Sequence, residues 1–140
     1  MHPFEPSSQI QPATAVLHEY EAALNRADVD TIASLYAADA VFMAQHRQPA
    51  VGEDQIRAAY SDIFTQIRLA IRFEIDEVEI VTPTVAYART RSAGTTTIVA
   101  NGAEIAEANQ ELFILGRTDE RSEWRIERYI FSTTQPMVQP

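Results

Sequence analysis

Apolar residues recur at two different spacings in the two halves of the chain. Up to about residue 67 they return every three or four positions, which is typical of helices with one buried face. From about residue 68 they alternate with polar residues, as in β-strands with one buried face. The sequence therefore predicts helices first and strands afterwards.

Three helices are predicted in the first half. One begins at Pro12, a residue favoured in the first helical turn, and extends to about Arg26. Asp28 can cap a second, short helix whose apolar positions include Tyr36. A short strand over residues 40–46 follows, and a break over residues 49–52 precedes the third helix. The apolar face of that helix contains Ile56, Tyr60, Ile63, Phe64 and Ile67.

Four strands are predicted in the second half. The first begins near Arg68, and its alternation changes phase after Ile75, which indicates a β-bulge at Asp76–Glu77. A turn over residues 82–84 leads to the second strand, and Asn101–Gly102 is typical of a tight hairpin to the third. The last strand covers residues 123–133. This order predicts an α+β domain with three N-terminal helices on one face of a curved, mostly antiparallel sheet.

The chain length suits one domain with one hydrophobic core, because 140 residues are too few for two full cores. We expect a flexible tail over residues 1–11, the domain over residues 12–134 and an irregular tail over residues 135–140. No membrane-spanning run or secretory signal is expected from the hydropathy pattern. The absence of cysteine fits a cytoplasmic protein.

The formal charge of −9 and the positions of glycine, histidine and carboxylate residues exclude several classes of partner and site. Phosphate backbones and anionic membranes attract dense Lys and Arg, whereas here 11 basic residues face 20 acidic ones, so we expect neither partner. The four glycines are too far apart for a dinucleotide-binding motif or a P-loop. No spacing of histidines and carboxylates indicates a metal site. We therefore expect no cofactor and no metal.

The segment NQELFIL, residues 109–115, places polar and apolar residues on the same face of a strand. Asn109, Glu111 and Phe113 share one face by alternation. Burial of a carboxylate is costly unless it is paired, hydrogen-bonded or protonated. Glu111 therefore indicates either a polar pocket or a structural ion pair, for which Arg91 and Arg128 are the candidates.

Alternation also predicts which side chains point into the space between the helices and the sheet. On the strand over residues 85–92 we place the small residues inward, because they leave room for a ligand. The expected ligand-binding residues from this pattern are Phe42, Ala44, Phe64, Thr90, Ser92, Asn109, Phe113, Tyr129 and Phe131.

The opposite sheet face is predicted to carry exposed apolar side chains. Exposed apolar patches usually indicate a binding partner, so we expect a homodimer through this outer face. Arg89 and Arg91 are expected near its rim. The predicted apolar positions are Tyr87, Leu112, Ile114, Ile126 and Ile130.

The motif pair LYAADAVF (35–42) and GEDQIRAAY (52–60), with the strand-rich second half, resembles the nuclear transport factor 2-like superfamily. The resemblance covers about residues 13–134 and implies a cone-shaped α+β barrel. This superfamily includes ketosteroid isomerase, scytalone dehydratase and the SnoaL-like polyketide cyclases. The ending NQELFILGRTDERSEWRIERYIF resembles more closely the SgcJ/EcaC group. Because the fold supports enzymes, binding proteins and assembly domains, it does not by itself imply one function.

Similarity to ketosteroid isomerase implies roles for four residues. Tyr20 falls at the position of the tyrosine that donates to the enolate oxygen, and Tyr36 and Tyr60 fall at two supporting tyrosines. Each tyrosine could also be an ordinary core residue with a satisfied hydroxyl. Glu111 falls at the position of an aspartic acid that an apolar site keeps protonated, so that it can donate a hydrogen bond.

The same comparison places Ala44 where those enzymes hold their carboxylate base. Alanine cannot remove a proton, so the usual steroid isomerase route is not expected. His46 lies two residues further on the same predicted face and could replace the base, or it could be a loop histidine at the pocket mouth. A bound water is the other candidate for moving the proton.

Two functions remain open at this stage. The first is a cofactor-free isomerase, cyclase or dehydratase that acts on a small hydrophobic compound, such as a polyketide- or steroid-like carbonyl. The second is a non-catalytic module of the same fold that binds a ligand or forms oligomers. A cavity of about 300 Å³ or more would favour the first function, and a cone filled by phenylalanine side chains would favour the second.

Overall fold

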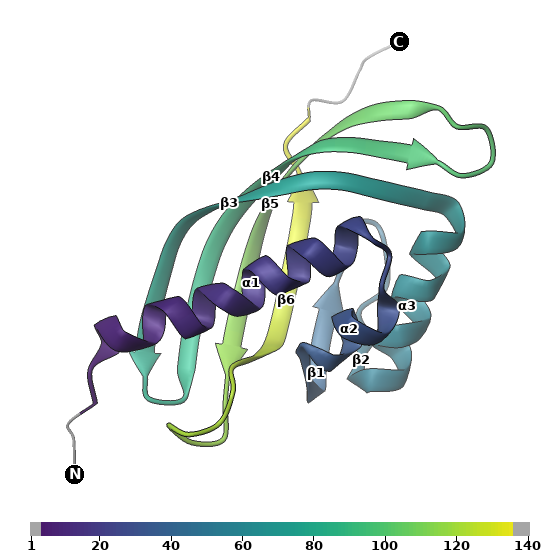
Figure 1. Ribbon diagram of the computed structural model, residues 1–140. Helices are drawn as coiled ribbons and strands as arrows, with labels where there is room; N and C mark the ends of the chain where they lie inside the picture. The colour runs from purple at the N-terminus through teal and green to yellow at the C-terminus, as the bar shows by residue number, and fades with distance from the viewer. Residues whose placement is uncertain (1–3, 136–140) are drawn as a thin grey trace.

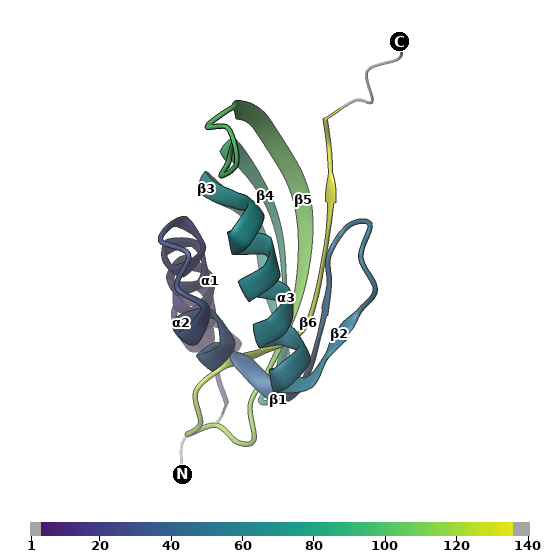
Figure 2. The same ribbon diagram turned by 90° about the vertical axis from the view of Figure 1, so that its right-hand side faces the viewer.

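Three α-helices cover one face of a strongly curved six-stranded sheet (Figure 1). The computed structural model describes residues 4–135. A view turned by 90° shows the helices on the concave side and no helix on the other side of the described sheet (Figure 2). The expected α+β fold, a cone between helices and a mostly antiparallel sheet, is confirmed.

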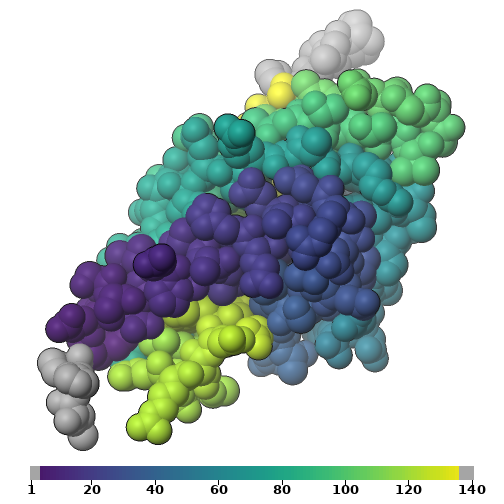
Figure 3. All heavy atoms as spheres, viewed as in Figure 1, coloured from purple at the N-terminus to yellow at the C-terminus, as the bar shows by residue number. Residues whose placement is uncertain are grey.

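The helical half is built from four segments. A short 3₁₀ turn, η1 (Pro6–Gln9), leads directly into α1 (Ile10–Asn25). The short helix α2 (Val29–Ser34) follows, and α3 (Gly52–Gln66) comes after the first two strands. On the surface, α1 and α2 form one continuous band between β3 and β4 on one side and the loop after β5 on the other (Figure 3).

The sheet has the strand order β2-β1-β6-β5-β4-β3, and only the pair β1–β6 is parallel. This parallel pairing places β1, from the first half of the chain, beside β6, from its end, and so joins the two halves in one sheet. The strands are β1 (Tyr36–Met43), β2 (Ala50–Val51), β3 (Ile67–Thr82), β4 (Val85–Ile98), β5 (Glu104–Gly116) and β6 (Arg125–Thr133).

Two helix boundaries differ from the prediction. Helix α1 begins at Ile10 and η1 begins at Pro6, so the expected tail over residues 1–11 is too long; residues 1–3 and 136–140 lie outside the described part. The cap at Asp28 is confirmed, since its carboxylate accepts the Thr31 N–H at 3.1 Å. Helix α2, however, ends at Ser34, and the placement of Tyr36 on it was wrong. Tyr36 pairs with Ile126 of β6, and this long-range pairing turns the chain into a strand.

The turns and bulges of the long strands are largely as predicted. The register shift between Ile75 and Glu77 confirms the bulge in β3. The hairpin at Asn101–Gly102 is present, but its loop spans residues 99–103 between β4 and β5. Within it, the Gly102 N–H donates to the Ile98 carbonyl at 2.8 Å.

A second bulge, in β6, changes which of its residues face the helices. The register shifts between the pairs Ile114–Arg128 and Leu115–Ile126, which leaves Glu127 as the extra residue. Glu127 lies over Gly116, where a Cβ would collide with its side chain. Ile126 is therefore fully buried, and its predicted place on the outer face was wrong.

The side chain of Asn25 fastens the end of α1 to β3. Its amide donates to the Ile71 carbonyl at 2.8 Å and accepts from the Ile71 N–H at 2.9 Å. Because β3 is an edge strand, no neighbouring strand would otherwise supply hydrogen-bond partners for the N–H and carbonyl of Ile71 on that side. The helix that carries Tyr20 is thus held at a fixed position over the sheet.

Among the described residues, no helix combines the length and apolar character that crossing a membrane requires.

Gly94 is predicted to be essential for the close approach of β3 and β4. A Cβ at this position would collide with the Ala70 carbonyl and lie 2.7 Å from the Ile71 Cα. We expect Gly94→Ala to lower the free energy of unfolding by about 1–3 kcal/mol, the usual cost of overpacking, in a urea titration. Gly102→Asn is the control, because Gly102 has φ 73°, which asparagine tolerates, and open space around it. Equal stability of Gly94→Ala and the native protein would contradict this role.

Candidate functional site

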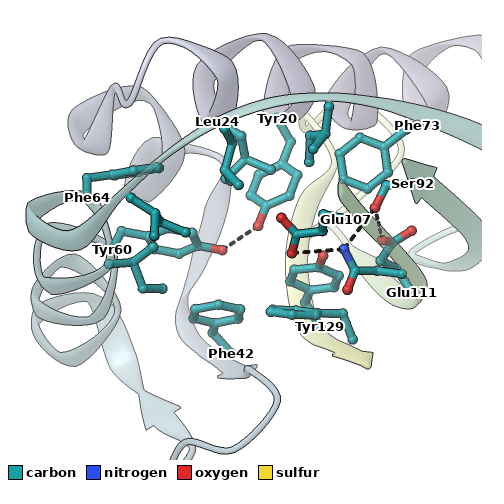
Figure 4. A pocket seen from close by; sticks show the side chains of 16 residues that line it. Tyr20, Leu24, Phe42, Tyr60, Phe64, Phe73, Ser92, Glu107, Glu111 and Tyr129 are labelled. Atoms are coloured by element: carbon teal, nitrogen blue, oxygen red, sulfur yellow. Dashed lines mark hydrogen bonds between the residues drawn. The ribbon is translucent and has the colours of Figure 1, made fainter. Parts of the chain in front are cut away.

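A pocket with a volume of about 80 Å³ lies between α1, α3 and the concave face of the sheet (Figure 4). Most of its wall is apolar, and aliphatic side chains from α3 and β3 complete it. The volume is well below the 300 Å³ that would favour an enzyme for a polyketide- or steroid-like compound, so by this criterion it favours the non-catalytic alternative. The aromatic residues that line it are Tyr20, Phe42, Tyr60, Phe64, Phe73, Tyr129 and Phe131.

The pocket is small because several aromatic rings stack on one another and fill space between the helices and the sheet. Phe113 is fully buried, and its ring centre lies 4.1 Å from that of Tyr129. Phe42 stacks on Tyr60 with ring centres 4.6 Å apart. These stacked rings occupy part of the cone, and a small pocket remains for a ligand.

Three tyrosine hydroxyls from separate elements form a hydrogen-bonded chain beside the pocket. The Tyr60 hydroxyl, from α3, lies 2.5 Å from the Tyr20 hydroxyl of α1 and 2.7 Å from the Tyr36 hydroxyl of β1. Burial raises the pKa of all three side chains above the ordinary value of tyrosine. They are therefore neutral hydrogen-bond donors at physiological pH.

Glu111 reaches the pocket from β5 and is only 5% exposed. Its carboxyl oxygens accept hydrogen bonds from Thr90 Oγ1 at 2.6 Å and Ser92 Oγ at 2.5 Å. Burial raises the pKa of Glu111 above its usual range, although these two hydrogen bonds oppose the rise. The side chain therefore has a proton available over a wider pH range than an exposed glutamate.

The alternative of an ion pair with Glu111 was wrong. The guanidinium of Arg91 pairs with Glu74 at 2.6 Å and Asp76 at 2.8 Å. Arg128 donates instead to a backbone carbonyl at 2.7 Å. Glu111 thus lies in the pocket without a cation among the described residues within ion-pairing distance.

Glu111 belongs to a longer set of polar side chains, which we call the polar ladder. Asn109 Nδ2 donates to Ser92 Oγ at 3.4 Å and to Glu107 Oε1 at 3.3 Å. The Thr96 hydroxyl donates to the other oxygen of Glu107. The ladder runs along the concave face of two neighbouring strands, β4 and β5. Its members are Thr90, Ser92 and Thr96 of β4, and Glu107, Asn109 and Glu111 of β5.

Glu107 was missed by the sequence analysis, although a signal for it exists. It lines the pocket together with Asn109 and Glu111. The three residues follow one another at every second position, so the alternation that places Glu111 inward also places Glu107 inward.

The structure brings together most of the residues predicted for the site, but not all of them. Tyr36, Ala44, Thr90 and Phe113 are buried, yet they do not line the pocket. Tyr36 and Thr90 lie behind it, as hydrogen-bond partners of Tyr60 and Glu111. The predicted residues that do line it are Tyr20, Phe42, Tyr60, Phe64, Ser92, Asn109, Glu111, Tyr129 and Phe131.

The predicted placement of His46 beside Ala44 on an inward face was wrong. Strand β1 ends at Met43, and His46 lies in the following turn with φ 64°. Its imidazole is exposed and lies 2.9 Å from the amide nitrogen of Gln45. A strand pattern does not continue through a residue of positive φ, so the alternative of a loop histidine is the one observed, and His46 does not line the pocket.

Within residues 4–135, no group of three or more His, Cys, Asp or Glu side chains is arranged to hold a metal ion. The chemistry of the described pocket is that of neutral hydroxyl donors, two carboxyl groups and one amide.

The sequence matches the SnoaL-like domain family over residues 17–125. A ketosteroid isomerase-like protein from Erwinia carotovora atroseptica SCRI1043 is 31% identical, with a TM-score of 0.87 over 91% of this chain and 98% of that one. A proposed scytalone dehydratase from Novosphingobium aromaticivorans DSM 12444 is 15% identical, with a TM-score of 0.79 over 95% of this chain and 91% of that one.

A third solved structure shares the fold. A proposed dehydratase of the NTF2-like family from Streptomyces avermitilis is 15% identical, with a TM-score of 0.76 over 94% of this chain and 100% of that one. The two matches at 15% identity show a common fold alone. No curated protein matches the sequence significantly.

The raised pKa of Glu111 predicts a pH-dependent stability. The native protein holds this proton more tightly than the unfolded chain, so its contribution is complete below the ordinary pKa of 4.5 and is lost as the pH rises through the folded value. We expect the difference in unfolding free energy between the native protein and Glu111→Gln to fall as the pH rises from about 4.5 to about 7.5 in urea titrations. Glu79→Gln, at an exposed position of β3, is the control. A difference that stays constant or grows with pH would show that Glu111 is not held protonated.

Proposed function

The chain belongs to the SnoaL-like domain family of the NTF2-like superfamily, and we propose that its pocket binds a compact, largely apolar molecule with one oxygen acceptor. The observation that carries this proposal is that the Tyr20 hydroxyl and the carboxyl group of Glu111, whose pKa burial raises, line the same aromatic pocket. Within the superfamily, we propose the SgcJ/EcaC group on the strength of residues 109–131.

The two donors approach the pocket from different elements. Tyr20 reaches in from α1 and Glu111 from β5 (Figure 4). Behind Tyr20, the hydroxyl of Tyr60 is itself bonded to Tyr36, so a ligand oxygen would join a chain that is already ordered. Ordered donors bind an acceptor with little loss of side-chain entropy.

The volume of the pocket sets the size of the ligand. A drug-sized or polycyclic molecule needs a cavity of about 300–1,000 Å³, whereas this one has about 80 Å³. We therefore propose a molecule of about one ring, such as a phenol or a cyclic ketone, in place of the steroid-like ligand.

A cofactor-free isomerase, cyclase or dehydratase activity is the second candidate function. It is favoured by the same two donors, because neutral donors in a water-poor site stabilise a developing enolate. A base is absent at Ala44, and His46 is exposed on a turn, so a bound water would have to move the proton. For this reason ligand binding is the first candidate.

Calorimetric titration with two phenols tests the proposed ligand. We expect 4-methylphenol to bind and 2-naphthol, with its second ring, to bind at least several-fold more weakly. Tyr20→Phe and Glu111→Met should each weaken binding of 4-methylphenol by about tenfold, since each loses one hydrogen bond to the oxygen. Tyr87→Phe is the matched control, because Tyr87 lies opposite Ile114 on the convex side of the sheet and does not line the pocket. Tighter binding of 2-naphthol, or unchanged binding by both variants, would reject the proposal.

We further propose that the protein forms a homodimer through the convex face of the sheet. Leu112, Ile114 and Ile130 are 41%, 37% and 47% exposed on this face. Leu112 is directly opposite Ile130 in the register, and Ile114 is opposite the half-buried Tyr87, so the four side chains form one patch. In the described part no helix covers this face, and a second copy would bury it (Figure 2).

A charge placed in this patch should separate the dimer. We expect a dimeric mass for the native protein at micromolar concentration by sedimentation equilibrium, and a monomeric mass for Leu112→Glu and Ile130→Glu, because a buried unpaired carboxylate is costly. Ile105→Glu is the control, since Ile105 is 53% exposed but lies near the β4–β5 hairpin, away from the patch. A monomeric native protein would exclude this assembly.

A further inference from the structure

The carboxylate of Glu107 faces an aromatic pocket that contains no basic side chain, and we propose that the ligand of this pocket carries a protonated amine. This inference rests on the proposed ligand-binding function and names the class of ligand. The amine would bind at Glu107, while the oxygen acceptor of the same ligand binds at Tyr20 and Glu111.

Glu107 is the more exposed of the two carboxyl groups in the pocket. Asn109 Nδ2 and the Thr96 hydroxyl each donate to one of its two oxygens. Glu111 also accepts two hydrogen bonds, so the number of donors does not distinguish the two carboxyl groups. Glu107 is only half-buried, whereas Glu111 is 5% exposed. Because a charge is less costly near water, Glu107 is the better placed of the two carboxyl groups to attract a cationic ligand.

Among the described residues, no cation lies within ion-pairing distance of Glu107. All eleven basic residues of the chain, apart from its histidines, are arginines, and none of them lines the pocket. Within residues 4–135, Glu107 has no ion pair within 4.0 Å, while the outer-face acids Glu74 and Asp76 are paired with Arg91. A negative charge that is partly removed from water and unpaired attracts a cationic ligand and repels an anionic one.

The aromatic walls add a second attraction for a cation. An ammonium group within about 6 Å of a ring centre is attracted by the π-face of the ring. Tyr20, Phe64 and Tyr129 line the same pocket as Glu107, which Figure 4 shows in the middle of the site. Rings and a carboxylate together match the chemistry of an amine, whereas neither suits a carboxylate or phosphate ligand.

The spacing of the two carboxyl groups fits a ligand with two polar ends. Glu107 and Glu111 are four residues apart on one face of β5, which separates their backbones by about 13 Å. Their side chains are joined through Asn109 and Ser92, which narrows the space between the carboxyl groups. A single ring with an aminomethyl group at one end and an oxygen at the other matches this arrangement.

Two phenols of equal size and different charge test the proposal. In calorimetric titrations we expect 4-(aminomethyl)phenol to bind about tenfold tighter than 4-(hydroxymethyl)phenol, because its ammonium makes a charge-assisted hydrogen bond. The preference should decrease as salt is added. Glu107→Gln should abolish the preference. Glu104→Gln, at an exposed position of the same strand, should keep the preference.

The outcomes separate this inference from the proposed function. Equal affinity for the two phenols, or a preference that survives Glu107→Gln, overturns the amine while binding of the neutral phenol remains. If neither phenol binds to the native protein, both the amine and the proposed function fail. A thermal unfolding curve for Glu107→Gln establishes that the variant is folded.

Discussion

A carboxyl group inside an aromatic core must be hydrogen-bonded or protonated, and this constraint on Glu111 shapes the rest of the pocket. It requires small hydroxyl residues directly opposite on β4, and the strand register supplies Thr90 there and Ser92 one step further along that face. The small side chain of Thr90 opposite the long side chain of Glu111 leaves space between the sheet and the helices. The neighbouring aromatic rings do not fill this space completely. The pocket, its neutral donors and the polar ladder all follow from accommodating this one side chain.

Local patterns were sufficient for the fold and for much of the site. The change from helical spacing to alternation gave the right layers, the phase change after Ile75 gave the bulge in β3, and alternation placed Thr90 and Glu111 inward. The failures arose where distant strands decide the conformation. Tyr36 is a strand residue because it pairs with β6, and Ile126 is buried because the bulge at Glu127 reverses the faces of that strand.

The sequence also could not reveal how much room the cone leaves. Counting phenylalanines and tyrosines does not show which rings stack on one another, and here Phe42 stacks on Tyr60 and Phe113 stacks on Tyr129. The remaining space is polar along one side, where β4 and β5 contribute hydroxyl, amide and carboxyl groups in register. In a pocket this small, the affinity of a ligand depends more on its charge and hydrogen-bonding groups than on its apolar area.

The clamp between Asn25 and Ile71 has a consequence for the solubility of the folded chain. Exposed edge strands invite pairing between molecules, and β3, with 16 residues, is a long one. The amide of Asn25 already binds both the N–H and the carbonyl of Ile71. Two charged side chains, Arg72 and Glu74, come next along the strand. The opposite edge, β2, has only two residues. Both ends of the sheet are thereby protected from the edge-to-edge association that leads to aggregation.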